Sequence, residues 1–165
     1  MGFTELNSVE HYIIHQMTGV NLNAAQDNNQ ITEPHGQYGL QWQFQSPEQL
    51  GRGVNEVLVE SVLVKALIRL NPDIETAPNL ADEVIHKLRA ILISVNQVGL
   101  VKANEEFFAW MTGEKTMPFG ENNRHVPVNL IDFDDLTRND YVVTNQFRIH
   151  HRETKIPDVV LLING

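Results

Sequence analysis

IPDVVLLING, which runs from Ile156 to Gly165, is the stretch that decides the fold. Its centre, Val159 to Ile163, is an unbroken apolar run, and such a run is typical of a central strand buried on both faces of a sheet. Pro157 starts this strand, and Asp158 stands one residue inside it. The closing pair Asn164-Gly165 is the strongest short hairpin signal, so we expect a returning strand and a chain that stops within an unfinished hairpin.

Upstream of this stretch, two further segments alternate apolar and polar residues with the period of a strand, Val126 to Phe133 and Tyr141 to Ile149. A weaker alternation from Tyr38 to Phe44 indicates one possible strand inside a long polar loop, residues 21–50. We predict a mixed central sheet built from the segments 126–133, 141–149 and 158–163, with the Asp158 strand in its interior and helices packed against it.

Helical spacing of apolar residues dominates the first two thirds of the chain. The expected helices are residues 8–18 ending at Gly19, a second reaching Leu70 and closed by Pro72, a third opened by Pro78-Asn79 and ended by Gly99, and a short one capped by Asn104 and ended by Gly113. Helices followed by strands indicate an α/β or α+β domain.

Length and composition exclude several classes of protein. A chain of 165 residues with 42% hydrophobic and 20% charged residues has the size of one globular domain and is not a disordered chain. The absence of cysteine excludes a disulfide framework and any thiolate zinc site. No apolar run is long enough for a membrane span, and the first residues lack a signal core, so a cytoplasmic protein is expected. The net charge of −9 argues against bulk attraction to DNA, which makes any nucleic-acid contact local.

Asp158 is the first candidate for chemistry, because an ionised carboxylate inside a buried strand needs a metal, a cation or several hydrogen-bond donors. The alternative is a strand-start aspartate bonded to neighbouring backbone, and periodicity leaves both open. Glu10 lies at the edge of the apolar face of its helix, from where its carboxylate could approach the sheet. The alternative for Glu10 is to satisfy the helix N-terminus. Glu60 has the same geometry in the second helix and competes with it.

A basic cluster precedes Asp158 and could meet a phosphate backbone, although a solvated hairpin loop is equally compatible with it. It consists of Arg148, His150, His151, Arg152 and Lys155. The two adjacent histidines are not a metal motif, because neighbouring strand residues point to opposite faces. Asp132, Asp134 and Asp135 lack the glycine and the glutamate of a calcium loop.

The C-terminal third, LIDFDDLTRNDYVVTNQFRI (Leu130 to Ile149) followed by IPDVVLLING, closely resembles the N-terminal nuclease region of type I restriction enzyme R subunits. The upstream segments LVESVLVKALIRLNP, KANEEFFAWMTGE and SVEHYIIHQMTGV resemble that family in order and spacing. The resemblance therefore covers nearly the whole chain, and it is weakest in the loop Asn21 to Gln49.

The resemblance implies a restriction-endonuclease-like α/β fold and a PD-(D/E)XK nuclease signature. Pro157, Asp158 and the Asn164-Gly165 turn match its first half, whereas the Glu-x-Lys half, on the returning strand, is not in the sequence. Asp158 and the second carboxylate would hold Mg²⁺, and the lysine would position water or stabilise negative charge. A helical glutamate often completes such a site, and Glu10 is our choice over Glu60.

By resemblance, residues 1–165 form the N-terminal part of a single nuclease domain, followed in the full-length protein by ATP-driven translocase domains. Double-stranded DNA and the modification and specificity subunits are the implied partners. We expect no cleavage from this chain alone, because half of the signature is absent. The alternative function is that of a noncatalytic, degenerate copy that serves as an assembly or DNA-contact module; an unrelated α/β binding protein is a third reading.

Overall fold

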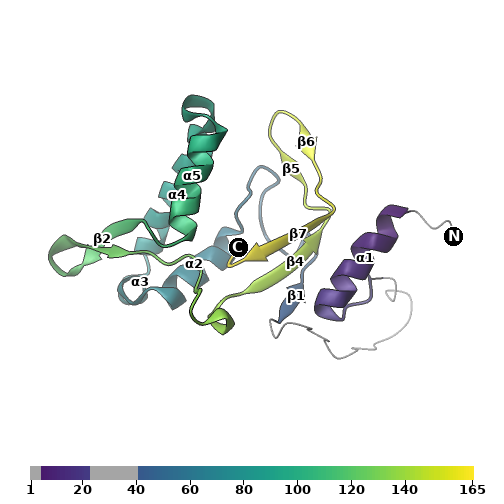
Figure 1. Ribbon diagram of the computed structural model, residues 1–165, viewed down its shortest axis with the longest axis horizontal. Helices are drawn as coiled ribbons and strands as arrows, with labels where there is room; N and C mark the ends of the chain where they lie inside the picture. Colours follow the sequence, from purple (N-terminus) through teal and green to yellow (C-terminus); the bar gives the residue numbers. More distant parts are fainter. Residues whose placement is uncertain (1–4, 23–40) are drawn as a thin grey trace. The chain divides into compact units, whose positions relative to one another are not determined.

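The computed structural model describes residues 5–22 and 41–165, and these divide into two compact units (Figure 1). The first unit falls within residues 1–59 and 140–163 together with Gly165, and the second comprises residues 60–139 together with Asn164. The assignment of residues 1–165 to one nuclease domain stays a prediction.

A three-stranded mixed sheet forms the first unit. Its strands are β1 (Trp42–Phe44), β4 (Tyr141–Asn145) and β7 (Val159–Ile163), in the order β1-β4-β7. β1 runs parallel to β4, whereas β7 is antiparallel to it, with Tyr141 opposite Ile163 and Asn145 opposite Val159. The helix α1 (Glu5–Thr18) packs against β1 and β4 (Figure 1). The expected mixed sheet with a helix against it is confirmed.

The core of this unit gathers around β4, whose first four residues are all buried. Val143 in β4 and Ile14 in α1 are completely shielded from solvent. At the start of β4, the ring of Tyr141 lies 5.1 Å from that of Trp42 in β1, in a tilted aromatic pair. Paired with β1 on one edge and β7 on the other, and buried along most of its length, β4 is the interior strand of the described sheet.

The prediction that the Asp158 strand is interior was wrong. β7 pairs only with β4 among the described strands, so it is an edge strand, and Leu161 and Ile163 are 51% and 40% exposed. Asp158 itself lies just before the strand and is exposed. An apolar run shows that a strand can be buried on both faces, but it does not show which neighbours are present to bury it.

A second correction concerns the segment Val126 to Phe133, which does not join the sheet of β4 and β7. Instead β3 (Arg124–Pro127) pairs antiparallel with β2 (Thr116–Gly120) in a separate two-stranded sheet of the second unit. The alternation continues after β3 because Val128 and Leu130 are buried there without being strand residues. The third strand of the main sheet is β1, within the possible strand Tyr38 to Phe44; the part of that segment before residue 41 lies outside the described residues.

The expected strand Tyr141 to Ile149 is also shorter than predicted. It ends at Asn145, and Gln146 adopts a left-handed backbone conformation with φ of 50°, which a strand cannot continue. Beyond it, β5 (Ile149–His150) and β6 (Thr154–Lys155) form a short antiparallel hairpin of their own. The alternation that the sequence shows through Phe147 and Ile149 therefore spans two strands.

The second unit is mainly helical, with α2 (Glu60–Leu70), α3 (Pro72–Thr76), α4 (Leu80–Val98) and α5 (Leu100–Met111). Two short 3-10 turns lie at Glu121–Asn123 and Leu136–Arg138. Leu67, Val84 and Leu88 are fully buried on the apolar helix faces. Among the described residues, no helix combines the length and the apolar character that crossing a membrane requires.

The predicted helix boundaries were confirmed at Gly19, Pro72 and Gly99 and wrong at Asn104. Pro72 stands at the first turn of α3, directly after the end of α2, and Gly99 ends α4 with φ of 87°. The helix expected to begin at the cap Asn104 instead begins at Leu100, which places Asn104 in its interior. The glycine that ends α4 also serves as the N-cap residue of α5, so a single position separates the two helices.

Polar contacts order the segment after β3 in the second unit. The side chain of Asn164 is almost fully buried, and its amide donates to the Leu130 carbonyl and to Oδ1 of Asn139, both at 2.8 Å. Arg69 and Arg138 each donate to the other's backbone carbonyl, at 2.9 and 2.8 Å. These contacts satisfy carbonyl groups that no regular secondary structure pairs.

Asp132 in the same segment gives a prediction about acid stability. The backbone N–H of Asp135 holds the pKa of Asp132 below its ordinary value, helped by the N–H of Asp134 and by Arg138. A depressed folded pKa stabilises the protein above the unfolded value of about 3.9, and this contribution disappears as pH falls through the folded pKa. We expect Asp132→Asn to be less stable than the native chain at neutral pH.

The test is chemical unfolding of both proteins between about pH 3 and pH 7. The difference in free energy of unfolding should shrink toward the acid end, because protonation of the unfolded carboxylate reduces the advantage of the ionised carboxylate in the folded state. A difference that stays constant over the whole range would contradict this account of Asp132.

Candidate functional site

The two acidic residues predicted from the sequence both contact one residue of the first unit, Gln146, Glu10 through its carboxylate and Asp158 through its backbone carbonyl. The side-chain amide of Gln146 donates to Oε1 of Glu10 at 2.9 Å, and its backbone N–H donates to the carbonyl of Asp158 at 3.1 Å. The next N–H, that of Phe147, donates to the carbonyl of Pro157 at 3.1 Å. The Pro-Asp dipeptide is thus held at the end of β4 by two backbone bonds, beside the helix that carries Glu10.

Local structure explains why Gln146 can make both contacts. Asn145 lies opposite Val159 in the sheet, so the register places Gln146 opposite Asp158. The left-handed backbone of Gln146 ends the strand at this point. Glu10 lies in α1, which packs against the sheet, and only 4% of it is exposed. Gln146 had no distinguishing signal in the sequence, because it is one uncharged amide within an alternating pattern.

Asp158 differs from the prediction in its environment. It is exposed and precedes β7, and among the described residues its carboxylate has no hydrogen-bond or ion-pair partner. The alternative that Asp158 satisfies buried backbone donors is therefore not what the structure shows. Asp158 also does not need the metal, cation or donors expected for a buried carboxylate, since an exposed carboxylate is solvated by water. What distinguishes this aspartate is that its backbone carbonyl accepts from Gln146, the residue whose side chain also bonds to Glu10.

Glu60, the competing candidate, lies in the second unit, and its carboxylate is bound by an arginine. Both of its carboxylate oxygens accept hydrogen bonds from the guanidinium of Arg89, in a bidentate ion pair between α2 and α4. Glu60 therefore joins two helices of its own unit. Of the two glutamates, only Glu10 contacts the same residue as Asp158.

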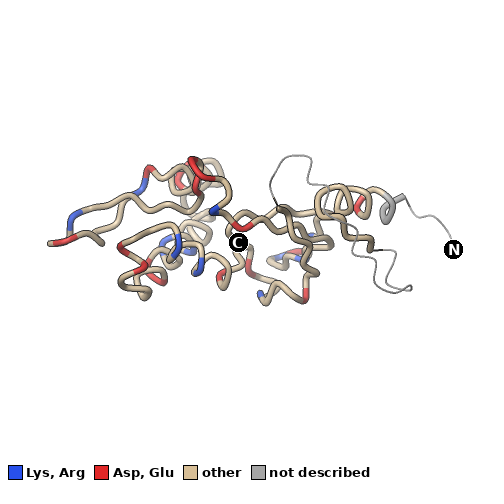
Figure 2. Tube along the Cα trace, turned by 90° about the horizontal axis from the view of Figure 1, so that it is seen from below, with Lys and Arg blue, Asp and Glu red and all other residues tan. Residues whose placement is uncertain are grey.

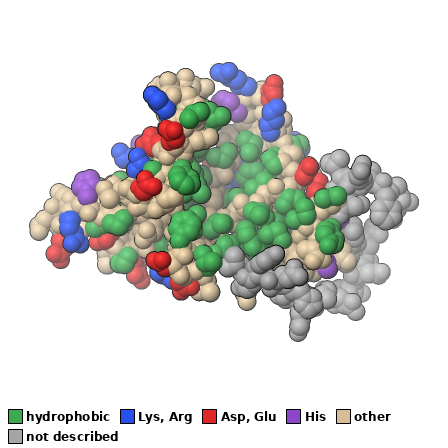
Figure 3. Space-filling model, viewed as in Figure 1, with side chains coloured by type: hydrophobic (Ala, Val, Ile, Leu, Met, Phe, Trp, Pro, Cys, Tyr) green, Lys and Arg blue, Asp and Glu red, His purple; other side chains and the backbone are tan. Residues whose placement is uncertain are grey.

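The basic cluster of the sequence forms the hairpin of β5 and β6, which we call the basic hairpin and define as Arg148–Lys155 (Figure 1). Arg152 and His151 are exposed at its turn, and in Figure 3 basic and histidine side chains lie together at the top of the visible face. By contrast, α1, next to the N-terminus label in Figure 2, contains no lysine or arginine. The basic cluster, for which a phosphate contact and a solvated hairpin loop were both open, thus forms an ordered but exposed hairpin.

Arg52 anchors the basic hairpin, and no motif or spacing in the chain had singled it out. Its guanidinium carbon lies 3.4 Å from the centre of the buried Phe147 ring. One of its terminal nitrogens donates to the Arg148 carbonyl at 2.7 Å, and the N–H of His150 donates to the Val54 carbonyl, also at 2.7 Å. The segment around Arg52 therefore fixes the base of the hairpin through one cation–π contact and two hydrogen bonds.

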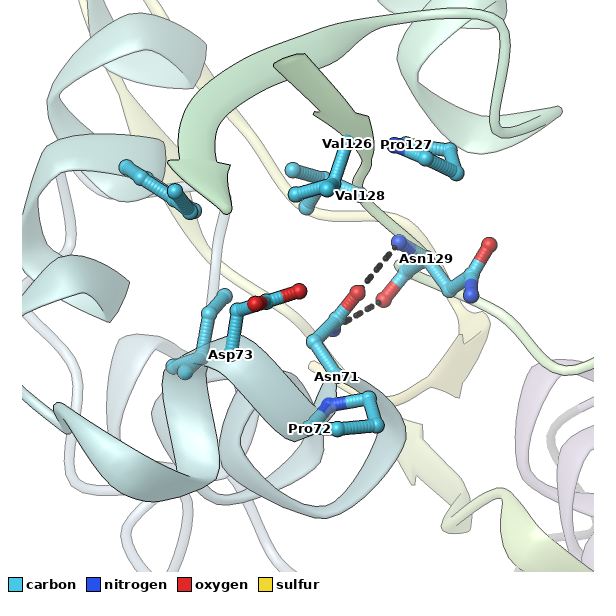
Figure 4. A pocket seen from close by; sticks show the side chains of 9 residues that line it. Asn71, Pro72, Asp73, Val126, Pro127, Val128 and Asn129 are labelled. Carbon is cyan, nitrogen blue, oxygen red and sulfur yellow. Dashed lines mark hydrogen bonds between the residues drawn. The ribbon is translucent and has the colours of Figure 1, made fainter. Parts of the chain in front are cut away.

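A cavity of about 230 Å³ in the second unit is a separate feature (Figure 4). It is lined by Asn71, Pro72, Asp73, Ile74, Phe119, Val126, Pro127, Val128 and Asn129. Figure 4 shows the Asn71 amide bonded to the backbone of Asn129, with its Oδ1 accepting at 2.7 Å and its Nδ2 donating at 2.9 Å. Asp73 is the one charged residue of the lining. One carboxylate is not enough for a metal site, and the described lining contains no nucleophile paired with a base.

Across the described ranges 5–22 and 41–165, no three residues of the types His, Cys, Asp and Glu are grouped closely enough to hold a metal ion. The candidate site therefore consists of two acidic residues, Glu10 and Asp158, both hydrogen-bonded to Gln146. Such a pair can contribute ligands to a metal site but is not a full set by itself.

We predict that Gln146 and Glu10 are energetically coupled. Gln146→Leu should lower the free energy of unfolding by about 1 to 3 kcal/mol, because the buried carboxylate of Glu10 loses a hydrogen-bond donor. The double variant Glu10→Leu/Gln146→Leu should lose less than the sum of the two single variants, by about 1 kcal/mol, since neither polar group is then left alone. Denaturant unfolding of the four proteins measures the coupling, and strictly additive losses would show that the contact contributes nothing.

Comparison with known proteins agrees with the resemblance stated above. The family described as the N terminus of the type I restriction enzyme R protein matches residues 27–165. A Methanocaldococcus jannaschii protein named as the type I restriction enzyme MjaIXP endonuclease subunit is 23% identical over 116 residues, which cover 67% of this chain but 11% of that protein. No solved structure matches the chain. Because the family match includes most of the sequence, the chain belongs to the family of type I restriction enzyme R protein N-terminal regions.

Proposed function

We propose that this chain contributes the DNA-cleaving site of a type I restriction enzyme, and that Asp158 and Glu10 take part in magnesium-dependent hydrolysis of phosphodiester bonds. One observation carries the proposal: Gln146 bonds to both the Glu10 carboxylate and the Asp158 backbone. The two acidic residues lie near opposite ends of the sequence, and each was a candidate before its place in the fold was known. The family match supports the nuclease context.

The chemistry of these side chains fits magnesium. Mg²⁺ prefers carboxylate oxygens and keeps several of its waters, so it needs only one or two protein carboxylates. Asp158 has an exposed carboxylate with no partner among the described residues, and it would be the ligand most open to DNA. Glu10 is buried, and the bond from Gln146 fixes one of its oxygens. Glu10 would thus be the better oriented of the two.

The backbone conformation of Asn164 and Gly165 is that of a hairpin turn, which supports the proposed PD-(D/E)XK signature. Asn164 has φ of 60° and Gly165 has φ of 89°, and two successive left-handed residues are characteristic of a type I′ hairpin turn. A strand that returned from this turn would run along the free edge of β7, with its far end level with Asp158. In the family pattern that strand carries Glu-x-Lys. Its glutamate and lysine would then lie beside Asp158.

In the proposed mechanism, each group of this chain has a defined task. Bound magnesium would supply positive charge for the scissile phosphate and a water of lowered pKa. Asp158 would hold the metal on the solvent side, and Glu10 would contribute a second carboxylate from α1. Gln146 would orient Glu10 and fix the backbone of Asp158, which keeps the two side chains in a constant relation.

The remaining partners follow from the type I restriction context. We propose assembly with modification and specificity subunits, action on double-stranded DNA, and a cytoplasmic location. ATP-driven translocation would belong to other parts of the R protein, because this sequence contains no phosphate-binding glycine loop.

Our prediction concerns Asp158→Ala in the complete restriction complex. The substitution should reduce magnesium-dependent DNA cleavage by about 100-fold or more, since loss of a metal ligand removes several kcal/mol of transition-state stabilisation. ATP hydrolysis and translocation should stay at the native rate. The thermal midpoint should hardly change, because Asp158 is exposed and makes no side-chain contact among the described residues.

Asp134→Ala is the matched control, since Asp134 is an exposed aspartate of the second unit. It should cleave DNA at the native rate. If Asp158→Ala also cleaved at the native rate, the chain would be a noncatalytic assembly or DNA-contact module instead of a nuclease.

A further inference from the structure

Positive charge in the first unit is concentrated in one place. This unit contains four lysine or arginine residues, and they are Arg52, Arg148, Arg152 and Lys155. Three of them belong to the basic hairpin, and the fourth, Arg52, anchors its base. The same unit contains nine aspartate or glutamate residues. A surface that is acidic overall thus has a single concentrated source of positive charge.

The basic hairpin is a structured element. Ile149 pairs with Lys155 and His150 with Thr154 across its two strands, and Nδ1 of His150 lies 2.9 Å from Oγ1 of Thr154. The N–H of His151 donates to the Glu153 carbonyl at 3.2 Å and closes the turn. Together with the contacts of Arg52 at its base, these bonds fix where the positive charges stand relative to the sheet.

The cationic groups of the hairpin are accessible. Arg148 and Arg152 are exposed, and among the described residues their guanidinium groups have no partner. Lys155 is exposed too, although it forms an ion pair with Glu153 at 2.9 Å. Counting that glutamate, the hairpin retains an excess of two positive charges. An exposed ion pair contributes little to stability and can exchange partners readily.

The hairpin rises from the end of the sheet where Asp158 lies. β5 follows the end of β4, and β6 leads directly through Ile156 and Pro157 to Asp158 (Figure 1). We propose that the basic hairpin binds the phosphate backbone of duplex DNA and so positions one strand of the DNA beside Asp158 and Glu10. This inference rests on the proposed nuclease function, to which it adds the element that holds the substrate.

General electrostatics favours DNA as the partner. Arginine forks match phosphate oxygens in a bidentate geometry, and backbone contacts position a duplex without reading its sequence. The net charge of −9 repels DNA from most of the protein, so local positive charge also determines which face approaches.

The test is DNA binding by the complete 165-residue chain, measured by fluorescence anisotropy with two labelled duplexes of unrelated sequence at several salt concentrations. The variant is the triple substitution Arg148→Gln, Arg152→Gln and Lys155→Gln. The control removes the same charge from exposed positions of the second unit: Lys87→Gln, Lys102→Gln and Arg124→Gln. The two triple variants have identical net charge, so a difference between them reports position alone.

The hairpin variant should bind both duplexes about tenfold or more weakly, and the slope of log affinity against log salt should fall by about 2 to 3, since each phosphate contact contributes about 0.9. The control should stay near the native slope. A conservative variant, Arg148→Lys with Arg152→Lys, keeps the charge and should keep the slope. Equal losses in the hairpin and control variants, or no loss in the hairpin variant, would overturn the proposal.

Cleavage by the complete complex separates this inference from the proposed function. Asp158→Ala should bind DNA with the native salt slope while losing cleavage. If the hairpin variant loses binding but Asp158→Ala still cleaves, the nuclease assignment fails and the DNA contact stands. If Asp158→Ala loses cleavage but the hairpin variant binds like the native chain, the DNA contact is wrong and the nuclease assignment stands.

Discussion

The antiparallel pairing of Tyr141–Asn145 with Val159–Ile163 is the interaction on which the first unit depends. Five residue pairs in one register bring together segments whose connection contains the basic hairpin and the Pro-Asp dipeptide. Because side chains alternate across a strand, a shift by one residue would reverse every side chain of one strand relative to the core. This register also sets Gln146 against Asp158. The candidate site is thus a consequence of how two strands align.

Gln146, the left-handed residue that follows β4, connects the two acidic residues of the candidate site. A non-glycine residue with φ of 50° costs about 1 kcal/mol or more, so surrounding contacts have to hold it in place. For Gln146 those contacts are the backbone bond to Asp158 and the amide bond to Glu10. The same turn of the chain sends Arg148 and the basic hairpin away from the sheet. One strained residue therefore separates a buried strand from a charged, exposed element.

The positions of β7 and Asp158 show that the physical reason for choosing a residue from the sequence can fail in the fold. Asp158 was singled out as a buried carboxylate that needed compensation, yet it is exposed and lies before an edge strand. It is linked to Glu10 through Gln146, which bonds to the Asp158 backbone and to the Glu10 carboxylate. An exposed carboxylate can exchange ligands with solvent, whereas a buried, hydrogen-bonded one stays fixed.

The sequence by itself determined those features that depend on neighbouring residues. Apolar spacing located the helices of the second unit, Pro72 and Gly99 marked their ends, and alternation located β4, because each of these signals acts within one or two turns of chain. The Pro-Asp and Asn-Gly pairs indicated the family and the left-handed turn for the same reason. Only the tertiary structure decided that Trp42–Phe44 and not the 126–133 segment completes the sheet, that β7 lies at its edge, and that Gln146 bonds to Glu10. Those outcomes depend on contacts between residues far apart in sequence, and local periodicity shows which face is apolar without showing which partner covers it.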